Sequence, residues 1–162
     1  MRTLTPRERQ TWINFTSGAY KPDPKAAYTS KDLVCDLVHM RNAWDMYQSR
    51  RDRDAIYIYL KRVYLVVRKW FKVGGTWYRA ALQYQGDNHP DISDPFAIAI
   101  ACSSDKKVVD RKTRSKWSRA LRYVHAEKPK GQPLAKFMQA QGGVNACARA
   151  FSGSKARRKA AE

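Results

Sequence analysis

The stretch DRKTRSKWSRALRYV, residues 110–124, separates charge from hydrophobic pattern more sharply than any other part of the chain. At about 100° per residue, a helix over these residues gathers an apolar stripe within about 60° of Trp117. The stripe consists of Trp117, Thr113, Ala120, Leu121 and Val124. Asp110 suits the N-cap position, because its carboxylate can accept from the free backbone N–H groups of the first turn. The stretch therefore predicts a helix that docks by one face.

The opposite side of this predicted helix is basic. It carries Arg111, Lys112, Ser115, Arg119 and Arg122, with Lys116, Ser118 and Tyr123 on the flanks. Eight Lys and Arg stand against two Asp between Asp105 and Val124, a local charge of +6. A solvated face is the plain interpretation, but solvated helices normally interleave Glu with Lys. We therefore favour a face that meets phosphates.

Composition indicates one globular domain with an anionic partner. The 162 residues are 43% hydrophobic and 12% aromatic, which is enough for a real core. Lys and Arg number 32 against 14 acids, for a net charge of +18 and a pI of about 10.1. Nucleic acid is the usual partner of such a chain, ahead of an anionic membrane surface or an acidic protein.

The three cysteines predict neither a disulfide framework nor a zinc site. Cys35, Cys102 and Cys147 are an odd number, lie far apart and form no C-x-x-C pair. Free buried thiols in a reducing cytoplasm are the simplest interpretation. The N-terminus has no hydrophobic signal core, and no apolar run is long enough to span a bilayer. We expect a soluble cytoplasmic protein that has no membrane partner.

Two core helices, followed by a short helix capped by Thr76 and running through Gln83, are expected within residues 29–84. Residues 1–28 before them predict an arm, with a short helix to about Phe15 and a proline-containing connector. Thr29 opens the first core helix, whose apolar residues follow at steps of four and three. The second, Ala55 to Phe71, is apolar around most of its circumference, so we expect other helices to surround it. Residues 48–54 between them allow either a turn or one continuous helix.

An acidic loop and a short apolar helix are predicted for residues 85–104. Asp94 is the expected cap of that helix and Pro95 its first residue. Asp87, His89 and Asp91 could be drawn as a metal site, but each acid has a simpler role in a turn or cap. We predict no metal. The basic helix then occupies residues 105–126.

The remainder predicts a helical hairpin over residues 133–151 and a flexible basic tail over 152–162. Gly142 and Gly143 separate its two short helices. The layout resembles a DNA-binding helix-turn-helix, in which Asn145 and Arg149 would reach base edges. An ordinary hairpin packed under the basic helix fits equally well.

No catalytic motif is present. The sequence contains no nucleotide-binding glycine loop, H-E-x-x-H pair or G-x-S-x-G elbow. We therefore predict no catalytic residues, no cofactor and no enzyme activity. The candidate nucleic-acid-binding residues are Arg111, Lys112, Arg114, Ser115, Lys116, Arg119, Arg122, Tyr123, Asn145, Arg149, Lys155, Arg157, Arg158 and Lys159.

The C-terminal third carries a resemblance. The run DRKTRSKWSRALRY and the later GGVNACA resemble small uncharacterised helical proteins of alphaproteobacteria and their mobile elements. The resemblance implies a bacterial source, such as a phage or plasmid, and it supplies no indication of an activity.

Together these patterns predict a single all-α domain, a bundle of five to seven helices with a central apolar helix and a basic amphipathic helix. Its expected function is to bind nucleic acid, DNA ahead of RNA, mainly through phosphates. One alternative is an anti-CRISPR-like inhibitor that occupies another protein's nucleic-acid groove or guide complex. A small nucleic-acid-processing enzyme is the other.

Overall fold

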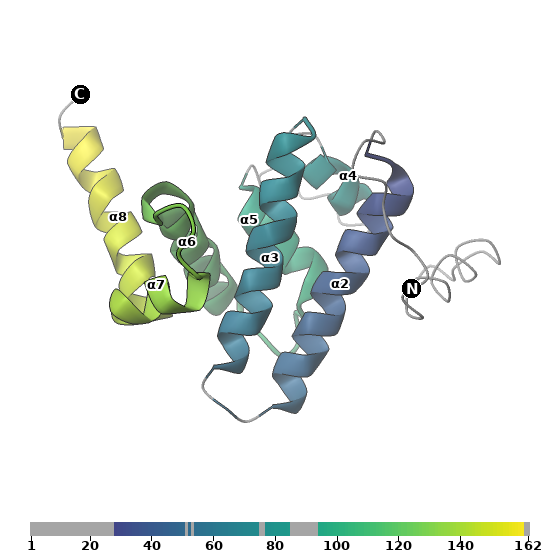
Figure 1. Ribbon diagram of the computed structural model, residues 1–162, viewed down its shortest axis with the longest axis horizontal. Helices are drawn as coiled ribbons and strands as arrows, with labels where there is room; N and C mark the ends of the chain where they lie inside the picture. Colours follow the sequence, from purple (N-terminus) through teal and green to yellow (C-terminus); the bar gives the residue numbers. More distant parts are fainter. Residues whose placement is uncertain (1–27, 51, 53, 75–76, 85–93, 161–162) are drawn as a thin grey trace.

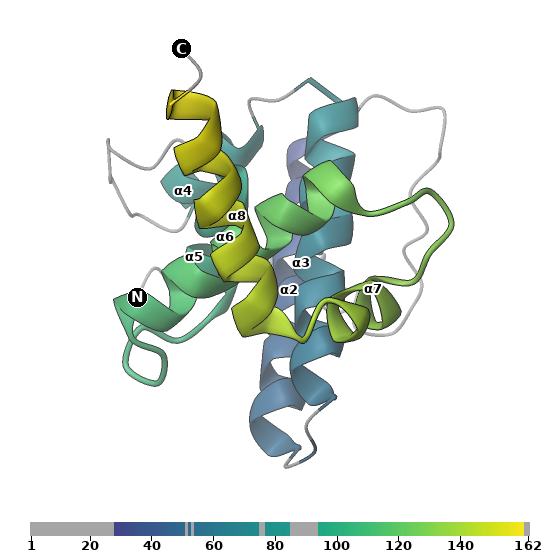
Figure 2. The same ribbon diagram turned by 90° about the vertical axis from the view of Figure 1, so that its left-hand side faces the viewer.

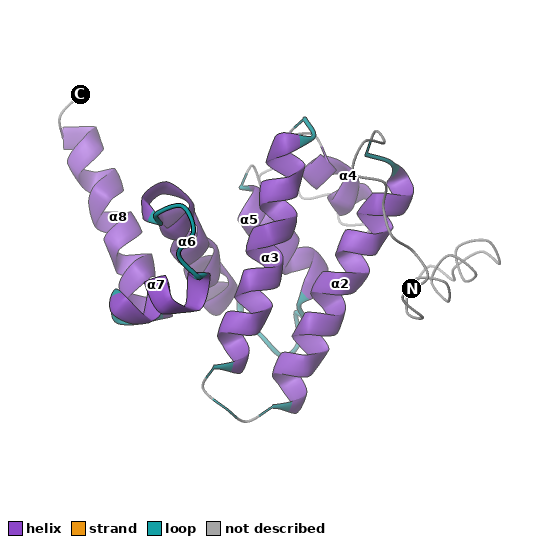
Figure 3. Ribbon diagram, viewed as in Figure 1, coloured by secondary structure: helices purple, strands orange, loops and turns teal. Residues whose placement is uncertain are grey.

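The computed structural model describes residues 28–50, 52, 54–74, 77–84 and 94–160, and beyond Gly153 it describes only the backbone. Within this part it contains seven α-helices and no strand (Figure 3). The prediction of an all-α single-domain bundle is confirmed. The expected N-terminal helix and the loop with Asp87, His89 and Asp91 lie outside the described residues.

Helices α2 (Ser30–Ser49) and α3 (Ala55–Lys72) lie side by side and run in opposite directions (Figure 1). Thr29 opens α2 as predicted and caps it, because its hydroxyl accepts from the backbone N–H of Asp32 at 3.4 Å. Its own N–H donates to the Asp32 carboxylate at 2.8 Å, which completes a capping box. The α2 helix ends at Arg50, whose N–H donates to the carbonyl of Met46 at 3.1 Å. The question left open by the polar segment 48–54 is settled in favour of two helices.

Helix α3 supplies the centre of the core. Its Tyr59, Leu60, Val63 and Val67 are fully buried. The prediction of a central apolar helix is therefore right, but the expectation that other helices surround it is wrong. Ile58 and Leu65 are 42% and 45% exposed, because α3 keeps one face toward solvent.

Helices α4 (Trp77–Tyr84) and α5 (Pro95–Ser103) pack beside the α2–α3 pair. Asp94 caps α5 as predicted, since its Oδ1 accepts from the backbone N–H of Phe96 at 3.1 Å and Pro95 begins the helix. A buried hydrogen bond of 2.8 Å between the hydroxyls of Tyr59 and Ser103 ties α5 to α3.

A polar network joins the start of α2 to α3. The Tyr28 hydroxyl donates to Asp36 at 2.6 Å and accepts from the indole N–H of Trp70 at 2.9 Å. Lys69 Nζ lies 3.2 Å from the other Asp36 oxygen. Burial raises the pKa of Asp36, although both the Tyr28 hydroxyl and Lys69 act to lower it. Removing this carboxylate from water therefore outweighs the stabilisation that its partners provide.

This raised pKa predicts a pH-dependent stability. The folded state binds the Asp36 proton more tightly than the unfolded chain does. The contribution of Asp36 to the free energy of unfolding should therefore be largest below the ordinary carboxyl pKa, and should fall as pH rises through the raised value. Urea unfolding of wild type and Asp36→Asn from about pH 4 to about pH 7 measures it. The wild-type advantage should shrink with rising pH, and an advantage that grows would contradict this assignment. Asp45→Asn, at an exposed position of α2, is the control.

Helices α6 (Arg111–Glu127), α7 (Leu134–Ala140) and α8 (Val144–Ala160) complete the fold. Trp117 of α6 is buried, with its ring centroid 5.8 Å from that of Tyr59 and 6.2 Å from that of Trp44. The predicted basic helix begins later than residue 105, because residues 105–109 form a hydrogen-bonded turn. Helix α8 crosses the outer side of α6, which therefore lies between α8 and the rest of the bundle (Figures 1 and 2).

The flexible tail predicted from residue 152 is wrong for residues 152–160, which continue α8. Residues 152–160 contain no proline, and a single glycine destabilises a helix by only about 1 kcal/mol. The Lys, Arg and Ala residues that follow are good helix formers. The turn before α8 matches the prediction, with Gly142 and Gly143 both at φ +89°, a backbone conformation that favours glycine.

Candidate nucleic-acid interface

Positive charge is concentrated in the last three helices. Residues 111–160 contain fourteen Lys and Arg and one acid, Glu127, for a net charge of +13. The complete chain carries +18. Most of the excess charge therefore lies on α6, α7, α8 and the segments that join them.

The first turn of α6 presents its cations to solvent. Asp110 Oδ1 accepts from the backbone N–H of Thr113 at 2.6 Å, and this hydrogen bond lowers the pKa of the Asp110 carboxyl. The predicted cap is thereby confirmed. Arg111, Lys112 and Ser115 are exposed. Since the Asp110 carboxylate already caps this helix end, the two exposed side-chain charges make this turn a candidate for an anion contact.

Two residues of α6 point inward instead. Ser118, predicted on a flank, is buried at 3% exposure, and its hydroxyl donates to the Asp94 carboxylate that caps α5. Arg114 is half-buried, and its Nε has no hydrogen-bond partner within the described part of the chain. Arg114 lies about 60° from Trp117 around the helix, which places it at the border of the buried side. These two side chains are poorly placed to meet phosphate.

Arg119 and Arg122 contact α8. Arg119 donates to the Ser152 hydroxyl at 3.1 Å, and the Arg122 guanidinium lies 4.5 Å from the ring centroid of Phe151. Arg122 also approaches Asp94 at 3.9 Å. The predicted outer face of α6 is therefore partly covered at these two arginines, because α8 crosses it. Arg122 remains partly open, with 44% of its side chain exposed.

Tyr123 and Lys116 lie on the other flank of α6. The Tyr123 hydroxyl donates to Gln141 at 3.2 Å, and its ring centroid lies 6.1 Å from that of Phe137 in α7. Tyr123 is therefore a contact between helices. Lys116 is half-buried.

Helix α8 presents its own polar side. Cys147 and Ala148 are buried, whereas Asn145 and Arg149 are exposed on the opposite side of the helix. Helix α8 packs mainly on α6 and less on α7, which is unlike the two helices of a helix-turn-helix. Docking against the basic helix was expected under the hairpin interpretation. Lys155, Arg157, Arg158 and Lys159 lie along the C-terminal half of α8.

The cysteines are packing residues, as predicted. All three are buried, and burial raises the pKa of Cys35 to about 12 and that of Cys147 in the same direction. The described residues contain no group of three or more His, Cys, Asp or Glu side chains that could hold a metal ion. None of the described helices has the length and apolar composition needed to cross a bilayer.

Sequence reasoning left the turn before α6 out of the site. Lys106 and Lys107 are exposed on it and adjoin Arg111 and Lys112. The net charge of residues 105–124 includes these two lysines, but the amphipathic pattern that defined the predicted site begins only after Asp110.

No protein-family model, curated protein or solved structure matches the chain.

Proposed function

We propose that this protein binds nucleic acid, duplex DNA in preference to RNA, through phosphate contacts of α6 and α8. The observation that carries the proposal is the charge of +13 on residues 111–160. A DNA duplex carries one phosphate charge per about 1.7 Å of its axis and releases counterions when Lys and Arg replace them. A surface rich in Lys and Arg suits such a partner.

The packing of α6 on α8 supports an anionic partner. The two helices contain eleven Lys and Arg, and Glu127 is their one acid. Arg119 and Arg122 of α6 contact neutral groups of α8, the Ser152 hydroxyl and the Phe151 ring. Like charges on neighbouring helices repel each other, and a polyanion lying across both would remove this repulsion.

Charge also favours a nucleic-acid partner over a protein target. An inhibitor that fills the nucleic-acid groove of another protein has to meet the Lys and Arg that line such grooves. A chain with a net charge of +18 is repelled by that surface. The phosphate backbone itself is the better electrostatic complement.

A salt series tests the proposal. The affinity of the purified protein for a labelled duplex should fall steeply, with log K against log [salt] having a slope of about −0.9 per phosphate contacted. Five contacts would give about −4.5. RNA of matched length and a neutral polymer are the comparison ligands. No binding to DNA at low salt, or a slope near zero, would contradict the proposal.

A further inference from the structure

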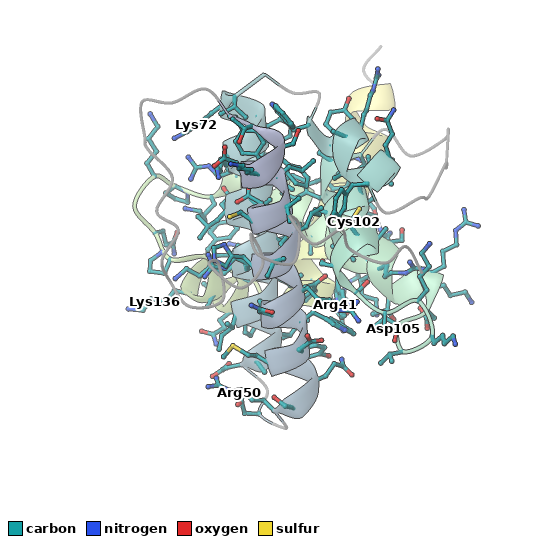
Figure 4. The ribbon with its side chains drawn as sticks, turned by 90° about the vertical axis from the view of Figure 1, so that its right-hand side faces the viewer. Arg41, Arg50, Lys72, Cys102, Asp105 and Lys136 are labelled. Atoms are coloured by element: carbon teal, nitrogen blue, oxygen red, sulfur yellow. The ribbon has the colours of Figure 1, made fainter. Side chains whose placement is uncertain are left out.

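The turn between α5 and α6 is a hydrogen-bonded projection. The backbone N–H of Lys107 donates to the Asp105 carboxylate at 2.8 Å, and the N–H groups of Val108 and Val109 donate to the Asp105 carbonyl at 3.2 and 3.0 Å. The Val109 side chain is buried and anchors the turn to the core. Figure 4, which labels Asp105 at the start of this turn, shows it at the edge of the molecule, as does Figure 2 from the opposite side. These hydrogen bonds and the buried Val109 side chain hold the turn in place.

The turn presents one apolar side chain between cations. Val108 is 58% exposed, whereas the other exposed large hydrophobic side chains of the described part are 39% to 46% exposed. Lys106 and Lys107 precede it, and Arg111 and Lys112 follow on the first turn of α6. The two nearby carboxylates form hydrogen bonds with the backbone: Asp105 accepts from the N–H of Lys107, and Asp110 accepts from the N–H of Thr113.

We infer that this turn enters the minor groove of duplex DNA, with Val108 against the base edges of A·T pairs and the flanking cations on the phosphates of the two strands. The inference rests on the proposed function and names the groove and base composition that the protein prefers. The minor groove is about 6 Å wide, which admits the tip of a turn and excludes a helix. Proteins that bind this groove use Arg and Lys there and frequently insert apolar side chains at its base steps.

The preference for A·T pairs follows from the floor of the groove. A G·C pair adds the guanine N2 amino group, a donor that projects into the minor groove. The methyl groups of Val108 would collide with that amino group and strip it of water without replacing its hydrogen bond. An A·T pair presents no such donor.

Three labelled duplexes of equal length test the inference, one rich in A·T, one in G·C and one in inosine·cytosine pairs. Inosine lacks the N2 amino group but keeps the major-groove edge of guanine, so it separates the two grooves. Wild type should bind the A·T and inosine duplexes about tenfold more tightly than the G·C duplex, the effect expected for two methyl groups. Val108→Ala should reduce this preference to within about twofold while leaving the salt slope and melting temperature unchanged. Val73→Ala, at an exposed valine after α3, is the matched control and should keep the preference.

Equal binding to all three duplexes by wild type would overturn the inference, as would a preference that survives in Val108→Ala. Inosine·cytosine behaving like G·C would place recognition in the major groove and also overturn it. In each of these cases a steep salt slope would leave the proposed function standing. Absence of binding to every duplex would overturn both.

Discussion

Replacing Trp117 by alanine should lower the free energy of unfolding by about 3 to 5 kcal/mol, the cost typical of a large core aromatic. The indole is 6% exposed and packs against Trp44, Tyr47 and Tyr59, with ring centroids 5.8 to 6.2 Å apart. Its removal leaves a cavity at the place where α6 meets α2 and α3. For a chain of this length the melting temperature should fall by roughly 6 to 20 °C.

Leu65→Ala is the control for this measurement. Leu65 is 45% exposed on α3, so its truncation should change the free energy of unfolding by less than about 0.5 kcal/mol. Chemical denaturation followed by circular dichroism measures both variants. A Trp117→Ala protein that unfolds with wild-type stability would contradict the placement of α6 in the core.

Local patterns predicted what local interactions determine. The caps at Thr29, Asp94 and Asp110 were predictable, because each side chain meets backbone N–H groups within three residues. The burial of Trp117, Leu121 and Val124 was predictable from the helical period alone.

Contacts between distant segments were not predictable in the same way. The helical period alone placed Arg119 and Arg122 opposite the buried stripe, and their angular position around α6 is correct. The period carries no information about a second helix that packs on that side. Their contacts with Ser152 and Phe151 depend on the path of the chain through the Gly142–Gly143 turn. The candidate site therefore shifts toward the first turn of α6.

The solvent face of α3 shows a second limit. Ile58 and Leu65 made the helix apolar around most of its circumference, and such a pattern normally means burial on every side. The pattern of apolar residues in a sequence does not distinguish a hydrophobic residue at the surface from one in the core. Only the arrangement of the neighbouring helices tells them apart.

Reversing the charge of Arg111 and Lys112 together should weaken DNA binding by on the order of a hundredfold. At 0.15 M salt each phosphate contact contributes about fivefold to affinity, and two glutamates add repulsion to the loss of two contacts. The slope of log K against log [salt] should become shallower by about 1.8, because two phosphate contacts are lost. The fold should be unharmed, because both residues are exposed in the first turn of α6, where negative charge favours the helix dipole.

The control is Lys61→Glu with Lys72→Glu, which lowers the net charge by the same four units on the exposed side of α3. Lys69 is unsuitable for this purpose, because it pairs with Asp36. Arg119 and Arg122 are unsuitable as the test pair, because their substitution would disturb the docking of α8 as well as the charge.

The most direct measurement of the central claim is the dissociation constant of both double variants for one labelled duplex at one salt concentration, with their melting temperatures recorded alongside. The account predicts that Arg111→Glu with Lys112→Glu loses on the order of a hundredfold in affinity, while the α3 variant loses less than about tenfold and both remain folded. Equal losses in the two variants would show that bulk charge, and not a site at the start of α6, governs binding, and would contradict the account.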